Sequence, residues 1–143
     1  MDATTFPEHL KPVAESFARQ KFANLIGAQL TALADDYCEI TLPAKEELLR
    51  PSGMFNGGVL GAIADAAAGY AAATHKNGNI YLVTAEFKIS FLSPAKGEKL
   101  IARSKVIKFG KTLVVADCNI FSITDNKEKL CAVALVTLYQ LKQ

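Results

Sequence analysis

A length of 143 residues is enough for one domain with its own hydrophobic core, and we expect residues 1–143 to form a single domain. The net charge of +2 comes from 16 basic and 14 acidic residues without a basic run, which argues against a nucleic-acid partner. The most apolar stretch, Val59 to Ala73, is too short to span a membrane and contains Asp65, and Met1 to Thr5 has no secretory-signal pattern. We therefore expect a cytoplasmic protein without membrane contact.

Three widely spaced cysteines, Cys38, Cys118 and Cys131, lie in strand-like contexts. Their odd number and the lack of a C-x-x-C pair argue against a disulfide framework and against a zinc site. We expect these thiols to be reduced and buried. A cysteine nucleophile would need a histidine partner, but His9 and His75 are both expected at the surface.

Residues 1–27 are predicted to form a loose lead-in followed by one amphipathic helix, which starts near Pro12 and ends at Gly27. Apolar residues share one side of this helix: Val13, Phe17 and Leu25. The loop from Pro43 to Phe55 later delivers the chain to a second, central helix. These two helices have different characters, because the first is amphipathic and the second is rich in alanine.

Alternation of polar and apolar residues predicts strands before and after the central helix. The predicted strands are Ala28 to Ala34, Tyr37 to Leu42, Ile80 to Phe91, Leu100 to Phe109, Thr112 to Thr124 and Leu130 to Leu141. The first two form a hairpin at Asp35-Asp36, and turns at Pro94, Gly110 and Asp125 join the last four into an antiparallel meander. The last strand is almost wholly apolar, so we expect it to be buried on both faces.

The strand from Ile80 to Phe91 alternates strictly along its length. One side carries its apolar residues: Val83, Ala85, Phe87, Ile89 and Phe91. The other side carries its polar residues: Thr84, Glu86, Lys88 and Ser90. The pattern therefore places Thr84 on the polar side of the strand.

The central helix is predicted to start after Asn56, a residue that can cap the first turn, and to stop between Thr74 and Gly78. One side should press on a sheet: Val59, Ile63, Ala66, Ala67 and Tyr70. The other side has small residues and one carboxylate: Gly58, Gly61, Ala62, Asp65, Ala68, Gly69 and Ala72. The order of the elements predicts an α+β domain in which a curved antiparallel sheet wraps around this long helix.

Asp65 is the first candidate for chemistry, because it has no cation within two turns on a side that should be closely covered. Such a carboxylate is either a partly buried structural group or a working base. Gly57 and Gly58 are the second candidate, since their unshielded N–H groups at the positive end of the helix dipole could polarise an acyl carbonyl oxygen. A tight entry turn or close packing is the alternative explanation of this glycine pair.

The spacing of these candidates predicts a two-fold arrangement. Asp65 follows Gly58 by seven residues, about 10 Å along a helix. A carbonyl oxygen donor and a base that acts through one water can be only about 7 Å apart. Two antiparallel copies of the helix could satisfy this limit, with Gly57 and Gly58 from one copy and Asp65 from the other, and would create two equal sites.

Two motifs carry a resemblance to a known family: Phe55 to Val59 with Ala64 to Tyr70, and Thr84 to Glu98. Together they resemble the hotdog-fold acyl-CoA thioesterases, most closely the phenylacetic-acid-degradation (PaaI-like) type, over residues 28–139. The resemblance implies dimers, often paired into tetramers, that hydrolyse acyl-CoA thioesters between subunits. It implies neither a metal nor any other cofactor.

The resemblance also implies roles for individual residues. Asp65 would activate water or attack as a nucleophile, Gly57 and Gly58 would donate to the thioester carbonyl, and Thr84 would supply a small hydroxyl near the acid. An ordinary half-exposed strand residue is the alternative for Thr84.

The chain departs from the family pattern at two positions. Asn56 replaces a frequent histidine and can still donate or cap the helix. Arg50 replaces a water-holding amide, so it could pair with Asp65, meet a CoA phosphate or an acidic acyl group, or simply be a surface arginine.

Small residues along the helix leave room for an acyl group, and we expect Gly61 and Ala62 to line its pocket with Phe55 and Tyr70, although packing alone would explain both aromatic residues. A non-catalytic acyl-CoA or lipid-binding hotdog dimer is the alternative function. A hotdog hydratase or dehydratase is a weaker third option, because such reactions usually need a histidine beside the acid and neither His9 nor His75 is suitably placed.

Overall fold

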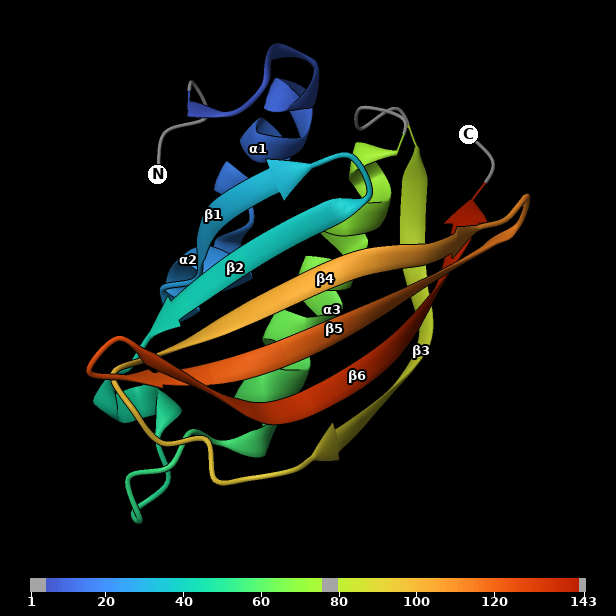
Figure 1. Ribbon diagram of the computed structural model, residues 1–143. Helices are drawn as coiled ribbons and strands as arrows, with labels where there is room; N and C mark the ends of the chain where they lie inside the picture. The colour runs from blue at the N-terminus through green and yellow to red at the C-terminus, as the bar shows by residue number, and fades with distance from the viewer. Residues whose placement is uncertain (1–4, 76–79, 142–143) are drawn as a thin grey trace.

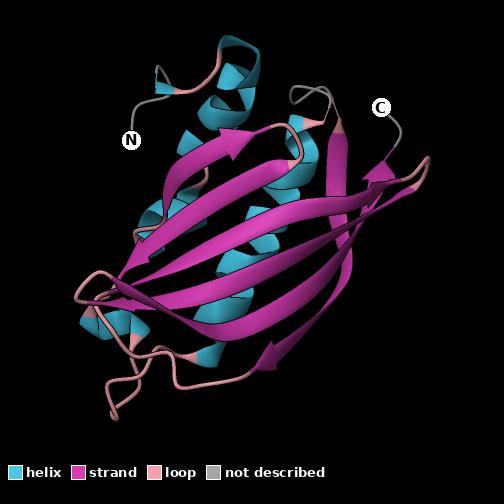
Figure 2. Cartoon of the chain, in the orientation of Figure 1, coloured by secondary structure: helices cyan, strands magenta, loops and turns pink. Residues whose placement is uncertain are grey.

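The computed structural model describes residues 5–75 and 80–141. Its helices are η2 (Glu8–Leu10), α1 (Lys11–Ala18), α2 (Lys21–Ile26), η3 (Glu46–Leu48) and α3 (Gly57–Thr74). Its strands are β1 (Gln29–Ala34), β2 (Tyr37–Pro43), β3 (Tyr81–Phe91), β4 (Lys99–Phe109), β5 (Leu113–Thr124) and β6 (Lys127–Leu141). They form one antiparallel sheet in the order β1-β2-β4-β5-β6-β3, which curves around α3 (Figures 1 and 2). The predicted α+β fold is confirmed.

Tight turns join neighbouring strands where the sequence predicts them. The β1–β2 turn contains Asp36 with φ 60°, and the β5–β6 turn contains Asp125 and Asn126 with φ 50° and 62°. Short polar side chains tolerate this left-handed conformation. At the β4–β5 turn, a Cβ on Gly110 would come within 2.6 Å of the Leu113 carbonyl oxygen, so the turn requires glycine. The hairpins β1–β2, β4–β5 and β5–β6 are confirmed.

β3 does not take part in the predicted four-strand meander. It pairs with β6 at the far edge of the sheet, and residues 92–98 then cross back to start β4 beside β2. The predicted turn at Pro94 therefore belongs to a crossing connection and not to a hairpin. The prediction failed because α3 packs across the inner face of the sheet and carries the chain to the side opposite β2 (Figure 1).

A β-bulge in β3 decides which of its side chains face the helix. Thr84 pairs with Leu138 but Glu86 pairs with Thr137, the preceding residue of β6, so Ala85 has no opposite residue. The strand changes phase at this point. The side chains on the helix side, which share pockets with α3, are therefore Leu82, Thr84, Phe87, Ile89 and Phe91. The predicted strict alternation is wrong at Ala85, and Thr84 lies on the inner side of the strand.

The sheet covers more of α3 than a single helix face. The buried residues of the helix are Leu60, Gly61, Ile63, Ala64, Ala67, Ala68, Ala71, Ala72 and Thr74. The predicted sheet side is correct for Ile63 and Ala67. It is wrong for Ala68 and Ala72, which are fully buried because the curved strands wrap around both sides of the helix. Three residues of the predicted sheet side are only half-buried: Val59, Ala66 and Tyr70.

The N-terminal segment forms two helices instead of the one predicted. Neither proline nor glycine marks the break between α1 and α2. The Asn24 side chain donates to the Ala18 carbonyl oxygen at 3.1 Å and satisfies an acceptor that the break leaves free. Gly27 ends α2 with φ 84°, as predicted. Phe17 is buried as expected, but the turn after α1 leaves Leu25 72% exposed.

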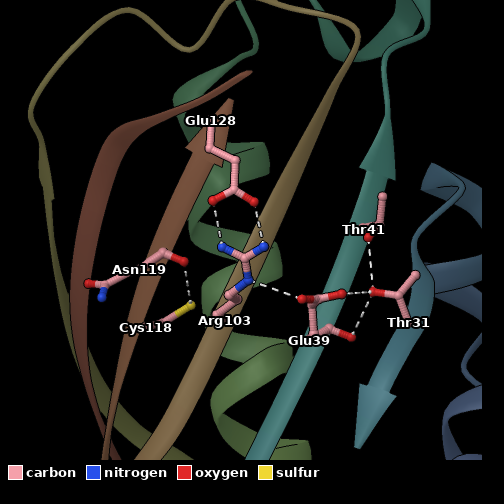
Figure 3. A network of polar contacts seen from close by, with 7 residues as sticks. All are labelled: Thr31, Glu39, Thr41, Arg103, Cys118, Asn119 and Glu128. Atoms are coloured by element: carbon pink, nitrogen blue, oxygen red, sulfur yellow. Dashed lines mark hydrogen bonds and ion pairs between the residues drawn. The ribbon is translucent and has the colours of Figure 1, made fainter. Parts of the chain in front are cut away.

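The outer face of the sheet is open in the single chain. Leu135 and Tyr139 of β6 are 48% and 42% exposed, so the prediction that this strand is buried on both faces is wrong for one copy of the chain. Towards the other end of the sheet, the Arg103 guanidinium on β4 bridges two carboxylates (Figure 3). Its Nε lies 3.0 Å from Glu39 on β2, and its Nη1 lies 2.9 Å from Glu128 on β6.

Candidate functional site

Asp65 and Thr84 form a hydrogen-bonded pair between α3 and β3. The Thr84 hydroxyl donates to Asp65 Oδ1 at 2.6 Å, which leaves Oδ2 available to another donor. The bulge at Ala85 makes this contact possible, because it turns Thr84 to the inner side of the strand. Asp65 is half-buried and takes part in no ion pair within the described residues. The pair is therefore a carboxylate held by a hydroxyl and not neutralised by a cation.

A groove runs from the start of α3 to this pair, and we call it the helix-start groove. Its volume is about 530 Å³ and its lining residues are Gly57, Gly58, Gly61, Ala62, Asp65, Phe87, Ile89 and Phe91. All the predicted site residues of α3 except Tyr70 thus share one groove with the inner side of β3. Phe87 and Phe91 were not predicted to belong to the site, since strict alternation placed them on the side opposite Thr84.

The N-terminus of α3 is capped as predicted. The Gly58 N–H donates to Asn56 Oδ1 at 2.8 Å, so this donor is engaged by the cap. The Gly57 N–H has no acceptor among the described residues. A Cβ on Gly57 would lie 3.3 Å from the Phe91 ring, which shows a close approach. The helix extends to Thr74, and the predicted stop signal at Asn77-Gly78 lies outside the described residues.

Arg50 lies on the other side of the helix start, in a second pocket of about 230 Å³. Phe55 and Gly57 also line this pocket. The possible pairing of Arg50 with Asp65 within one chain is not observed among the described residues, because the two side chains line different pockets. Arg50 is exposed, whereas Phe55 is only 3% exposed and contributes mainly to the core.

Tyr70 lies beyond Asp65, one and a half turns further along α3. Its ring packs edge to face on Phe17 of α1, with 5.2 Å between the centroids. Burial raises the pKa of the Tyr70 phenol, while hydrogen bonds from Ser16 and Gln20 lower it. Tyr70 lines a third cavity, of about 550 Å³, which we call the α1–α3 cavity. The Tyr70 side chain does not line the helix-start groove, where Gly61 lies.

The histidines and cysteines of the described residues lie outside this site. His9 bonds to Asp35 and His75 to Asp36, both at 2.8 Å, and both histidines are exposed as predicted. All three cysteines are free and buried, also as predicted. Burial raises the pKa of the Cys118 thiol to about 12, so this group is neutral at ordinary pH. The described residues therefore provide no paired cysteine and histidine.

A curved antiparallel sheet wrapped around one long helix is the hotdog fold. Within it, the chain carries a carboxylate held by a hydroxyl and, eight residues earlier on the same helix, an N-terminus with an N–H donor that has no acceptor among the described residues. This combination defines a class of candidate hydrolase whose chemistry depends on a carboxylate and main-chain donors.

Comparisons with known proteins give the family. Residues 52–129 match the family model described as the Thioesterase superfamily, and the chain belongs to this superfamily. A Saccharolobus solfataricus protein, whose name gives esterase as an inferred activity, is 36% identical over 128 residues, 87% of this chain and 81% of that protein. The family and its relatives support hydrolase activity.

Solved structures support the same conclusion. The crystal structure of a thioesterase family protein from Silicibacter pomeroyi has a TM-score of 0.90 and 32% identity, covering 94% of this chain and 99% of that one. The PaaI protein of the E. coli phenylacetic acid degradation operon has a TM-score of 0.82 at 20% identity, with 94% of each chain covered. This second likeness shows the shared fold alone. The resemblance to hotdog-fold thioesterases is confirmed.

Proposed function

We propose that the protein hydrolyses an acyl-CoA thioester to the free acid and CoA, without a metal or another cofactor. The observation that carries the proposal is the Asp65–Thr84 pair, in which a hydroxyl and no cation holds the carboxylate. Since no cation occupies the carboxylate within the described residues, Oδ2 is free to accept a proton from a bound water molecule. Membership of the thioesterase superfamily supports the thioester as the bond that is cleaved.

In the proposed reaction, Asp65 Oδ2 takes a proton from a water molecule while Thr84 holds Oδ1. The water oxygen forms a bond to the thioester carbonyl carbon, and the carbonyl electron pair moves to the oxygen. Collapse of this tetrahedral oxyanion breaks the carbon–sulfur bond, and the departing thiolate takes up the proton from Asp65. Direct attack by Asp65, through an anhydride that water then hydrolyses, uses the same groups.

Main-chain donors at the start of α3 would stabilise the oxyanion. The Gly57 N–H is the free donor, and the helix dipole adds to its effect. The Gly58 N–H becomes a second donor when the Asn56 side chain turns away from the cap. Arg50 lines a pocket together with Gly57, and in this proposal its guanidinium contacts a CoA phosphate or an acidic acyl group.

One chain does not bring donor and base close enough. Gly57 and Asp65 are eight residues apart on α3, about 12 Å along the axis. We therefore propose a homodimer, either alone or as half of a tetramer, in which Gly57 of one copy faces Asp65 of the other. The outer edge of β3 supports this pairing, because no described strand lies along it and the 11-residue strand has exposed apolar side chains such as Val83 and Phe87.

A complementation experiment tests the proposal. Asp65→Asn removes the base, and Gly57→Pro removes one N–H at the first helical position, where proline is compatible with a helix and with the extended Asn56. Each variant alone should be nearly inactive towards acyl-CoA thioesters in a thiol-release assay. Co-expressed together, they should recover about one quarter of the wild-type activity, because half of the dimers are mixed and each has one complete site.

The matched control for Gly57→Pro is Gly57→Ala, which adds a side chain but keeps the N–H. No recovery in the mixed dimers would contradict a site shared between copies. Binding of acyl-CoA without turnover by the wild type would instead support the non-catalytic hotdog dimer.

A further inference from the structure

The α1–α3 cavity begins at the proposed reacting groups. Asp65 and Thr84 line one end of this cavity, and Ala62 and Asp65 line the helix-start groove as well. A thioester carbonyl held beside Asp65 therefore lies at the junction of the two spaces. An acyl group attached to that carbonyl has the cavity directly in front of it.

The walls of the cavity are mainly apolar and come from three parts of the chain. Phe17 and Phe22 form the wall contributed by α1 and α2, and Leu82 and Leu138 form the wall contributed by the sheet. Gly69 lies on α3 between them, where even an added Cβ would come no closer than 4.0 Å to Leu138. The N-terminal wall lies outside residues 52–129, the part that matches the family model.

The N-terminal wall is firmly attached to the rest of the fold. Phe17 is 5% exposed and packs on Tyr70, and Leu10 and Val13 are almost fully buried. Phe22, in contrast, is 59% exposed and lies at the rim. The cavity therefore has a fixed inner wall and an aromatic side chain at its outer edge.

The length of the cavity sets the size of its occupant. From Asp65 to Ala73, which also lines the cavity, α3 advances about 12 Å. An extended chain advances about 1.2 Å per bond, so this length holds an acyl chain of roughly eight to ten carbons. The volume of about 550 Å³ is within the range of small-molecule pockets.

We infer, on the basis of the proposed function, that the α1–α3 cavity binds the tail of a medium-length apolar acyl group, with Gly69 and Phe22 as specificity-determining residues. Gly69 keeps the middle of the cavity open, and Phe22 closes its rim. The N-terminal helices thus select the substrate, whereas α3 and β3 carry the reacting groups.

The test compares kcat/KM for butyryl-, octanoyl- and hexadecanoyl-CoA. The wild type should prefer octanoyl-CoA over both other substrates. Gly69→Leu fills the cavity while raising helix propensity, and should lower the octanoyl-to-butyryl ratio about tenfold or more. Phe22→Ala opens the rim and should raise the hexadecanoyl-to-octanoyl ratio. Loss of folding cannot shift these two ratios in opposite directions.

Leu25→Ala is the matched control, because Leu25 is an exposed apolar residue of α2 that does not line the cavity. An unchanged octanoyl-to-butyryl ratio in Gly69→Leu would overturn the inference while leaving thioester hydrolysis intact. If the wild type cleaves none of the three thioesters, calorimetric binding of octanoyl-CoA decides. Weaker binding to Gly69→Leu than to the wild type supports the cavity assignment, and equal binding overturns it.

Discussion

The two edge strands of the sheet share a local feature, a threonine bonded to a carboxylate beside a register shift, but the two carboxylates have different surroundings. Both β1 and β3 contain a register shift, and near each shift a threonine hydroxyl donates to a carboxylate. On β1, Thr31 donates to Glu39 Oε1 at 2.7 Å, and on β3, Thr84 donates to Asp65 Oδ1 at 2.6 Å. Glu39 also forms an ion pair with Arg103 (Figure 3). Asp65 has no cation among the described residues.

Both carboxylates accept from a threonine hydroxyl, so the difference between structural Glu39 and the candidate base Asp65 is the cation that Glu39 binds. Glu39 is bound on both sides, by Thr31 and by Arg103, so its charge is compensated and its geometry is fixed. Asp65 is oriented by Thr84 but keeps Oδ2 free, and it lines two cavities instead of a closed network. A hydroxyl partner orients a carboxylate without neutralising it.

The largest effect on activity is expected when Asp65, the carboxylate that has no cation, is replaced. Asp65→Asn should lower kcat for a thioester substrate by about 10²- to 10⁴-fold, because it removes the general base while keeping the size of the side chain. Glu39→Gln is the matched change at the other edge and should leave kcat near the wild-type value. Steady-state kinetics of the two variants measures both effects. Equal losses of kcat would contradict the different roles of Asp65 and Glu39.

A smaller effect is expected from the two hydroxyls. Thr84→Val removes the hydrogen bond to Asp65 and should lower kcat about 10- to 100-fold, the range of a hydrogen bond to a charged group. Thr84→Ser keeps the hydroxyl and should retain most of the activity. Thr31→Val, the equivalent change on β1, should lower the melting temperature without lowering kcat. A full loss of activity in Thr84→Ser would show that the methyl group and not the hydroxyl matters.

The smallest effect is expected from replacing Arg103, the cation that binds Glu39, and it should appear in stability. Arg103→Met should lower the free energy of unfolding at pH 7 by about 1–2 kcal/mol, because it leaves Glu39 and Glu128 without their cation. Hydrogen bonds from Arg103 lower the pKa of Glu128 in the folded protein. Ionised Glu128 therefore stabilises the fold above the ordinary glutamate pKa of about 4.3, and this stabilisation is lost as the pH falls through the lower, folded value.

Chemical denaturation of the wild type and Arg103→Met between pH 7 and pH 3 measures this effect. The difference in free energy of unfolding should shrink as the pH falls. A difference that stays constant over this range would show that packing of Arg103 on Phe121, 5.0 Å from the ring centroid, accounts for the effect.

Local signals explain most of the fold that was predicted correctly. The Asn56 cap, the Asp36 and Asp125 turns and the Gly110 turn act within a few residues of where they lie, so the sequence reveals them directly. The break between α1 and α2 has no such signal, because neither proline nor glycine occurs there and the Asn24 side chain supplies the missing donor.

The candidate site was predictable only in part. Asp65, Gly57 and Gly58 share a groove, as their positions on one helix suggested. The contact between Thr84 and Asp65 agreed with the family resemblance but contradicted the alternation of β3, since the unpaired residue is Ala85 and alanine gives no sign of a bulge. Their catalytic roles remain predictions for the experiments above.

The sequence by itself determined the helix that carries Asp65, the hairpins and the buried cysteines, because each depends on local propensity or on the polarity of neighbouring residues. Only the tertiary structure decided that β3 pairs with β6, that its bulge turns Thr84 inward and that α1 and α2 close a cavity beside Asp65. These features depend on which distant segments pack together, and pairing energies between distant segments are not encoded in the periodicity of either one.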